Sequence, residues 1–302
     1  MDIKAFTESF SASLSALGWY DSREIRTMAS YILKEVAGVE PYKIIVSPEQ
    51  ELGCDISVKL QQIILQMAKG RPMQYVMGYE YFCGHKFNVS EGVLIPRPET
   101  EEIVRHVIRE AEAAMAGRNL KILDICTGSG CIAWSLAAAL PESQVWGCDI
   151  SAKALDIAKS QNSGEGTTGR VHFLRCDILA ADALDILSMA GELDIVVSNP
   201  PYVCEGERGQ MRPNVLDFEP EEALFVPDDE PLLFYERIAE LSCRVLKEGG
   251  SLYFEVNEKF GAEVASMLGR SGFSGCEVVK DMFGKERMVK AKKIEKSGIT
   301  VG

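Results

Sequence analysis

The segment Asn199-Pro200-Pro201-Tyr202, which follows the apolar run 193–198, combines residue types that could hold a flat polar group. Pro201 pushes Pro200 into an extended conformation, and both rings fix φ. The side-chain carbonyl of Asn199 and the backbone carbonyl of Pro200 are then two fixed acceptors, which could hold the two hydrogens of a planar NH2 group. The ring of Tyr202 offers a face on which an amide or a base could lie. A rigid loop after a strand is the alternative interpretation.

A second candidate is the segment DICTGSG (124–130), which joins an expected strand to an expected helix. Its glycines would let the backbone approach a ligand, and the free N–H groups at a helix start suit an anion. A tight strand-to-helix turn would look similar, so both interpretations stay open at this point. The segment lacks the full G-x-G-x-x-G pattern, and there is no Walker lysine. NAD and ATP are therefore less favoured than another adenosine-bearing ligand.

Two carboxylates follow the neighbouring strands. Asp149 ends the next strand, 19 residues after Gly130. At this place in dinucleotide-binding folds a carboxylate accepts hydrogen bonds from ribose hydroxyls. Asp177 ends the strand VHFLRCD (171–177), from which it could reach an adenine amine. The alternatives are a capping or solvated carboxylate at Asp149 and a turn-forming one at Asp177. Combined with the glycine turn, Asp149 favours a nucleoside site.

These candidates need a sheet whose strands end at one edge. Apolar runs predict buried strands at 121–125, 144–150, 171–177, 193–199 and 250–256. Helical patterns separate them, at 131–140, 151–162 with Ser151 as N-cap, and around 181–190 and 230–247. This alternation predicts a mostly parallel sheet covered by helices on both faces, a doubly wound α/β fold. The loop 203–229 is long and irregular, which is typical of a functional or disordered segment.

The N-terminal quarter has a different pattern. Apolar residues recur at helical spacing from Ile25 to Val36, with Asp21 and Ser22 as start signals, and again from Ile56 to Met67. The aromatic, alternating segment 79–95 carries a central glycine and predicts a β-hairpin. We therefore expect three parts: a helical domain (1–75), a β-hairpin linker (76–97) and the α/β domain (98–302).

Composition limits the remaining possibilities. The chain has 302 residues, 46% of them hydrophobic, and a formal net charge of −13, which counts against a broad nucleic-acid-binding surface. Nine cysteines without a C-x-x-C spacing are expected to be free thiols in a reducing cytoplasm. We expect no signal peptide and no membrane span. The histidines have no ligand spacing, so no metal is proposed.

Several segments together carry a family resemblance. They are RPMQYVMGYEYFCGHKFNV (71–89), VLIPRPETE (93–101), ILDICTGSGCIA (122–133), CDISAKALDIAKSQN (148–162), DIVVSNPPYV (194–203), FEPEEAL (218–224) and KDMFGKERMV (280–289). With these the chain resembles S-adenosylmethionine-dependent amino methyltransferases that carry N-P-P-Y. More closely, it resembles the PrmC/HemK family of protein-(glutamine-N5) methyltransferases, which modify peptide chain release factors. The resemblance covers nearly the whole chain.

The resemblance implies a Rossmann-like methyltransferase domain with S-adenosylmethionine as cofactor, and an N-terminal helical domain that helps to hold the release factor. The implied cofactor residues are Cys126, Thr127, Gly128, Ser129, Gly130, Asp149, Asp177, Ile178 and Asn199. The implied substrate residues are Asn199, Pro200, Pro201 and Tyr202, and the implied catalytic ones are Asn199, Pro200 and Tyr202. Family members often have glycine where this chain has Cys126, which puts the backbone angle there in question.

The resemblance also implies the reaction and its partners. Asn199 and the Pro200 carbonyl would accept the two N–H bonds of the glutamine amide and aim its nitrogen at the methyl group. Class-1 release factors are the expected partners, with no membrane, no direct nucleic acid, a monomeric state and a cytoplasmic location. The same NH2 chemistry allows a ribosomal-protein glutamine or adenine in nucleic acid as the acceptor. A binding module that has lost catalysis is a third possibility.

Two further segments have open roles. Arg97, Glu99 and Thr100 could cap the helix that follows them or line the cofactor pocket. Glu219 could order the long loop, or it could be a solvated loop residue.

Overall fold

The computed structural model describes residues 1–115, 117–161, 167 and 169–295. The chain divides into two compact units. The first comprises Met1–Gly78 together with Met211–Phe218, and the second comprises Tyr79–Gln210 together with the residues from Glu219 onward. The end of the predicted helix 151–162 at Asn162 and the end of the predicted domain 98–302 lie outside the described residues. No described helix is long and apolar enough to cross a membrane.

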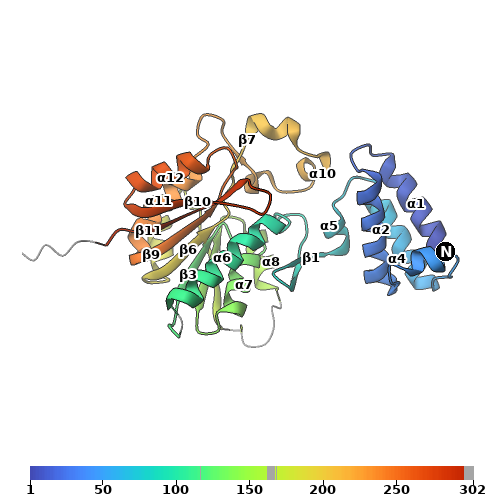
Figure 1. The fold of residues 1–302 in the computed structure, drawn as a ribbon, viewed down its shortest axis with the longest axis horizontal. Helices are drawn as coiled ribbons and strands as arrows, with labels where there is room; N and C mark the ends of the chain where they lie inside the picture. Colours follow the sequence, from blue (N-terminus) through green and yellow to red (C-terminus); the bar gives the residue numbers. More distant parts are fainter. Residues whose placement is uncertain (116, 162–166, 168, 296–302) are drawn as a thin grey trace, which may run out of the picture. The chain divides into compact units, whose positions relative to one another are not determined.

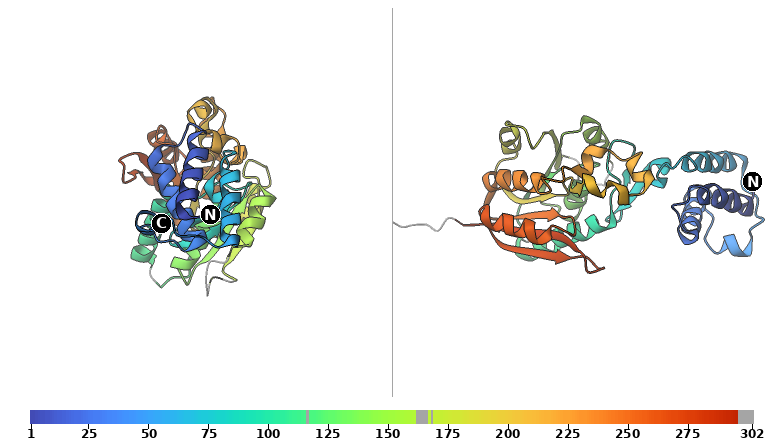
Figure 2. Two further views of the ribbon diagram at one scale, coloured as in Figure 1. Left: turned by 90° about the vertical axis from the view of Figure 1, so that its right-hand side faces the viewer. Right: turned by 90° about the horizontal axis from the view of Figure 1, so that it is seen from above.

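The first unit is helical. Its elements are α1 (Ile3–Ser15), α2 (Ser22–Ala37), α3 (Lys43–Val46), α4 (Cys54–Met67), α5 (Met73–Met77) and α10 (Pro213–Leu216). Helices α1, α2 and α4 pack on one another (Figure 2) around a core that includes Phe6, Phe10 and Leu33. The predicted start of α2 is confirmed: Asp21 is its N-cap, and Asp21 and Glu24 form a reciprocal capping box.

The second unit contains a seven-stranded sheet with helices on both faces (Figure 1). The strands lie in the order β10-β11-β9-β6-β3-β4-β5. Their bounds are β3 (Lys121–Ile125), β4 (Gln144–Asp149), β5 (Val171–Arg175), β6 (Leu193–Ser198), β9 (Leu246–Glu255), β10 (Phe273–Lys280) and β11 (Glu286–Lys293). The first five of these run parallel, whereas β11 is antiparallel to β9 and β10 is antiparallel to β11. The predicted doubly wound α/β class is confirmed.

Alternation along the strands builds a separate core on each face of the sheet. Leu123 and Ile125 of β3 face one core, whereas Ile122 faces the other. The first core includes α9 (Ala183–Ser188), α11 (Leu233–Val245) and α12 (Gly261–Arg270). The second includes α6 (Pro98–Met115) and α7 (Cys131–Ala139). The sheet is therefore held in place from both sides.

Two predicted local elements are confirmed. The strands β1 (Tyr79–Phe82) and β2 (His85–Asn88) form an antiparallel hairpin, which ends before the predicted bound at residue 95. Helix α8 (Ala152–Lys159) has Ser151 as its N-cap, whose side chain accepts a hydrogen bond from the Ala154 N–H. All nine cysteines are free thiols, as expected.

The segment 203–229 is more ordered than its sequence suggests. It contains β7 (Val203–Cys204), the 3-10 helices η1 (Glu205–Gln210) and η2 (Glu221–Ala223), α10, and β8 (Phe225–Val226), which pairs in parallel with β7. These elements are too short to show any periodicity, so the sequence indicates only an irregular loop. The antiparallel strands β10 and β11 were also not expected, because serine, glycine and glutamate interrupt the apolar residues of β10 and lysines interrupt those of β11.

Candidate functional site

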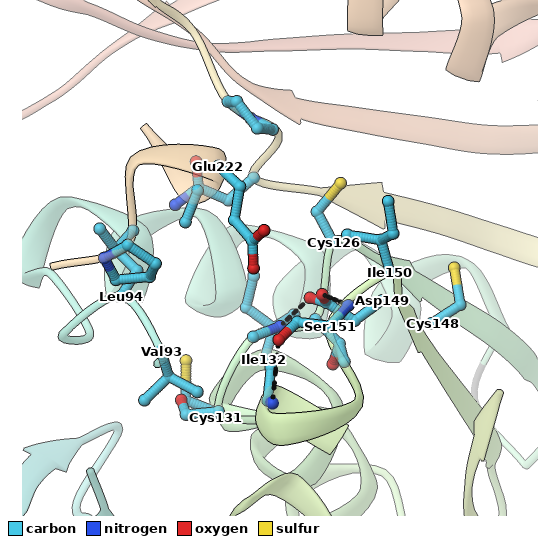
Figure 3. A pocket seen from close by; sticks show the side chains of 18 of the residues that line it. Val93, Leu94, Cys126, Cys131, Ile132, Cys148, Asp149, Ile150, Ser151 and Glu222 are labelled. Atoms are coloured by element: carbon cyan, nitrogen blue, oxygen red, sulfur yellow. Dashed lines mark hydrogen bonds between the residues drawn. The ribbon is translucent and has the colours of Figure 1, made fainter. Parts of the chain in front are cut away.

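A cavity of about 250 Å³ lies at the carboxyl edge of the parallel strands (Figure 3). This is where ligands bind in open α/β sheets. Its lining residues come from the segment before α6 and from the turns after β3, β4, β5 and β6. Others come from η2 and from the first turns of α6, α7, α8 and α11. The lining residues used below are Arg97, Thr100, Cys126, Thr127, Gly128, Ser129, Asp149, Asp177, Ile178, Asn199, Pro201 and Glu222.

The turn after β3 follows an unusual backbone path. Cys126, Gly128 and Gly130 all have positive φ, at 61°, 53° and 79°. The question raised by Cys126 is thereby answered: it adopts the left-handed conformation that glycine accepts at no cost and other residues adopt at about 1–2 kcal/mol. A Cβ atom at Gly128 would meet nothing within 4 Å, so the backbone there lies open to a ligand.

Gly130 has a packing role. It is not among the described residues that line the cavity. A Cβ atom at this position would lie 3.0 Å from the Ala158 side chain and 3.1 Å from Trp134. Gly130 therefore allows α8 to pack closely against the turn, so the structure places it behind the cavity wall, unlike the other turn residues proposed to bind a cofactor.

A buried carboxylate holds the turn in shape. Asp124 accepts a hydrogen bond from the Thr127 hydroxyl at 2.5 Å and one from the Ala133 N–H at 3.1 Å. Burial raises the pKa of Asp124 to about 7, although both hydrogen bonds oppose the rise. Gly147 of β4 lies beneath the same turn, where a Cβ atom would be 2.7 Å from the Thr127 hydroxyl oxygen and 2.7 Å from Phe173. No local pattern in the sequence singled out Gly147.

Asp149 lines the cavity at the end of β4 (Figure 3). Its two carboxylate oxygens accept hydrogen bonds from the backbone N–H groups of Gly128 and Ser151, both at 2.9 Å. Burial raises the pKa of Asp149, and the charge of Glu222 adds to the rise. Each oxygen keeps a further lone pair, so the carboxylate can still accept hydrogen bonds from a ligand's hydroxyl groups.

The next strand contributes Asp177 and Ile178, which both line the cavity. Asp177 is exposed and accepts a hydrogen bond from the Leu179 N–H at 2.9 Å. It thus forms a local turn and faces the cavity as well, so the two interpretations of this residue are compatible. Together with Asp149 and Glu222, Asp177 makes the charged part of the cavity lining predominantly acidic.

The segment after β6 divides between the cavity and the interior. Asn199 and Pro201 line the cavity, whereas Pro200 and Tyr202 are not among its described lining residues. The Tyr202 hydroxyl donates to Glu255 at 3.0 Å, and its ring packs against the core on that face of the sheet. Burial raises the pKa of Tyr202 well above its ordinary value, so its hydroxyl stays protonated.

The segment before α6 is tied to the long loop. Glu219, which is buried, accepts from the Ile95 N–H at 3.0 Å and from the Arg97 guanidinium at 2.6 Å. Glu219 is therefore an ordering residue, and the solvated interpretation of it is wrong. Arg97 and Thr100 line the cavity, and Thr100 donates to Glu255 at 2.6 Å.

Two further acidic residues, Glu255 and Glu222, were not predicted from the sequence. Glu255 is the last residue of β9, at the same edge of the sheet as Asp149. The rule that selected Asp149 and Asp177, a carboxylate at the carboxyl end of a predicted strand, would also have selected Glu255. Glu222 had no such signal, because it lies in a segment without a predicted element.

The strand order and the cavity at the carboxyl edge are those of a Rossmann-like fold, and the match to a methyltransferase family model makes this protein a Rossmann-like methyltransferase. Residues 122–210 match the family model of a methyltransferase domain, and residues 8–78 match that of the PrmC N-terminal domain. The fold resembles the hMettl16 catalytic domain in complex with a MAT2A 3′UTR hairpin. The TM-score is 0.53 and the identity 14%, over 83% of this chain and 86% of that one.

Sequence comparison gives the particular family. A release factor glutamine methyltransferase of Bacteroides thetaiotaomicron is 43% identical over 90% of this chain and 94% of its own length. One of Flavobacterium psychrophilum is 39% identical over 96% of this chain and 99% of its own length. The chain belongs to the release factor glutamine methyltransferase family.

Proposed function

We propose that this enzyme transfers a methyl group from S-adenosylmethionine to the side-chain amide nitrogen (N5) of the glutamine in the Gly-Gly-Gln motif of class-1 peptide chain release factors. One observation carries the chemistry: the Asn199 amide lines the same cavity as the Asp149 carboxylate. The names of the relatives support the identity of the acceptor. They do not favour adenine or a ribosomal-protein glutamine.

The cavity suits S-adenosylmethionine. Asp149 would accept hydrogen bonds from the ribose hydroxyls, and Asp177 and Ile178 would lie by the adenine. The open backbone at Gly128 allows close approach, with Cys126, Thr127 and Ser129 beside it, and Gly130 supports the turn. An acidic lining favours a ligand that carries positive charge. When bound, the cofactor supplies a methyl carbon whose bond to the sulfonium sulfur breaks with the electron pair left on sulfur.

The substrate amide needs positioning more than activation by a base, because its nitrogen lone pair is delocalised into the carbonyl. The Asn199 side-chain oxygen and the Pro200 backbone oxygen would accept its two N–H bonds and orient the nitrogen. Positive charge develops on that nitrogen as its new bond to carbon forms, so acceptor oxygens stabilise the transition state more than the ground state. The proton then leaves to water. Pro201 and the Tyr202 ring are proposed to complete the substrate side of the site.

The remaining parts have proposed roles as well. The helical domain (1–75), which overlaps the match to the PrmC N-terminal domain, would recognise the release factor. Residues 76–97 would link it to the catalytic domain (98–302). The enzyme is proposed to act as a monomer in the cytoplasm, without direct contact to nucleic acid.

The test is a labelling experiment. The enzyme is mixed with methyl-labelled S-adenosylmethionine and a class-1 release factor, and with a control factor whose Gly-Gly-Gln glutamine is changed to alanine. We expect label in the first and none in the control. Equal label in both would place the methyl group on another residue. An absence of label in both, with cofactor binding confirmed, would contradict the proposed acceptor.

A further inference from the structure

A chain of side-chain hydrogen bonds runs from the interior to the amide of Asn199. The Asn199 Nδ2 donates to the Thr100 hydroxyl oxygen at 3.3 Å. The Thr100 hydroxyl donates to Glu255 Oε2 at 2.6 Å. The other oxygen of Glu255 accepts from the Tyr202 hydroxyl at 3.0 Å. These residues come from three separate segments, the end of β9, the turn after β6 and the start of α6, which meet only in the folded chain.

This chain of hydrogen bonds has a direction, set by which atom of each pair donates. A hydroxyl carries one hydrogen, and the hydrogen of Thr100 is used in its bond to Glu255. Thr100 can then only accept from Asn199, so it must face the NH2 end of that side chain. The amide of Asn199 is held with Nδ2 inward, which leaves its carbonyl oxygen for the substrate. The reverse orientation would present an NH2 group to the substrate NH2, and two donors cannot bond each other.

The direction originates at Glu255. An ionised carboxylate only accepts hydrogen bonds, and each of its oxygens faces a hydroxyl. Burial raises the pKa of Glu255, whereas the two hydroxyl donors and the charge of Arg287 favour the ionised form. Tyr202 stays protonated and so remains a donor. Glu255 is 1% exposed, so water does not compete for its oxygens.

Building on the proposed function, we propose that Glu255 is a positioning residue for methyl transfer: through Thr100 it sets the direction in which the Asn199 amide faces the substrate. Glu255 touches neither substrate nor cofactor in this proposal. It acts by deciding which atom of Asn199 the substrate meets. The expected effect therefore falls on kcat, while cofactor affinity and fold stay as they are.

Two substitutions test this chain of hydrogen bonds. Glu255→Gln keeps the shape but lets the new NH2 group donate to Thr100, which permits the reversed direction. Thr100→Val removes the hydroxyl altogether. We expect each to lower kcat at least about tenfold, with the Kd of S-adenosylhomocysteine within about threefold of wild type. Thr100→Ser restores the hydroxyl and is expected to recover most of the rate that Thr100→Val loses.

A second hydrogen bond between β9 and α6 provides a matched control. The Tyr253 hydroxyl donates to Glu110 at 2.6 Å, so this pair also joins β9 to α6, outside the cavity. Glu110→Gln and Tyr253→Phe should alter kcat less than about twofold. If they lower it as much as Glu255→Gln does, the effect belongs to general sheet–helix packing and the proposal is wrong.

A second readout needs no methyl acceptor. The side-chain NH2 of Asn199 gives a pair of 1H–15N resonances, which are assigned by their loss in Asn199→Ala. These resonances should move in Thr100→Val and Glu255→Gln and stay in place in Tyr253→Phe. Unmoved resonances in the first two variants would overturn the proposal. If the wild-type enzyme does not methylate a release factor but the resonances still move in Thr100→Val and Glu255→Gln, only the proposed function is contradicted. If Glu255→Gln does not fold, Thr100→Val and Thr100→Ser decide.

Discussion

Asn199 is the residue on which the proposed reaction depends most. It lines the cavity, and its Nδ2 is already bonded to Thr100, so its oxygen is the atom left for the substrate. Asn199→Ala should lower kcat by about 10²-fold or more, the range measured when a transition-state hydrogen-bond partner is removed. The thermal unfolding midpoint should change little, because the half-buried Asn199 side chain is not among the residues of the described cores. Near-normal turnover of Asn199→Ala would remove it from the mechanism.

A second prediction at the residue scale concerns the backbone conformation of Cys126. At an ordinary position alanine is more stabilising than glycine by about 0.5–1 kcal/mol. Cys126 has φ of 61°, where a Cβ atom is strained. Both Cys126→Gly and Cys126→Ala lose the thiol, so their difference isolates the backbone. We expect Cys126→Gly to be the more stable by about 1 kcal/mol in urea unfolding. A more stable alanine variant would show that the turn relaxes.

Residue types alone indicated much of this site. Asp149, Asp177, Asn199 and the glycine turn were all found from their places after predicted strands, and the cavity brings them together. The chemistry of an acceptor pair was also readable from Asn199 and the prolines. What residue types could not show was that Tyr202 directs its hydroxyl inward to Glu255. Nothing in the local sequence distinguishes a tyrosine hydroxyl that faces a ligand from one that is bonded to a buried carboxylate.

At the scale of elements, β4 must pass closely beneath the turn that follows β3. A Cβ atom at Gly147 would lie 2.7 Å from both Thr127 and Phe173. Gly147→Ala should therefore destabilise the protein by about 1–3 kcal/mol and weaken cofactor binding. Gly269→Ala is the matched control: it lies in α12 with nothing within 4 Å, so it should stabilise by up to about 1 kcal/mol. Equal effects of the two substitutions would contradict the close approach.

Asp124, which holds the connection between β3 and α7 in shape, makes the free energy of unfolding depend on pH. Its pKa is about 7 in the folded protein, against 3.8 for an unperturbed aspartate, so folding favours the protonated form. The stabilisation of the folded state by protonated Asp124 is complete below pH 3.8 and is lost as pH rises through 7. The unfolding free energy of Asp124→Asn, relative to wild type, should therefore rise between about pH 4 and pH 8, by about 1.4 kcal/mol for each pH unit of the pKa shift. A difference independent of pH would show that Asp124 is ionised throughout.

The whole molecule consists of two units, and residues 211–218 of the long loop belong to the helical one. Arg212 forms an ion pair with Glu24 of α2 at 2.9 Å. The helical unit has its own apolar core, which includes Phe6 and Leu33. Removal of residues 1–78 takes away this core and keeps residues 211–218, which makes the proposed role of the helical domain testable.

If the helical domain recognises the release factor, its removal should weaken recognition of the release factor and leave cofactor binding unchanged. A chain that begins at Tyr79 should methylate the release factor at least about 100-fold more slowly in kcat/KM. Its Kd for S-adenosylhomocysteine, measured by calorimetry, should stay within about threefold of the full chain. A truncated chain that binds the cofactor and methylates at the full rate would contradict a recognition role for residues 1–75. Loss of cofactor binding would show instead that the helical unit supports the catalytic one.

The sequence by itself determined the five parallel strands of the doubly wound sheet, the hairpin, the capped helices and most of the residues at the carboxyl edge. These follow from patterns within a few residues: apolar runs, helical spacing, caps and prolines, which act through local sterics and hydrogen bonds. The tertiary structure alone decided that Thr100, Asn199 and Glu255 form one directed chain, because their contacts join positions up to 155 residues apart. It also decided the left-handed backbone at Cys126, because the packing of the turn between strand and helix holds a conformation that local preference disfavours.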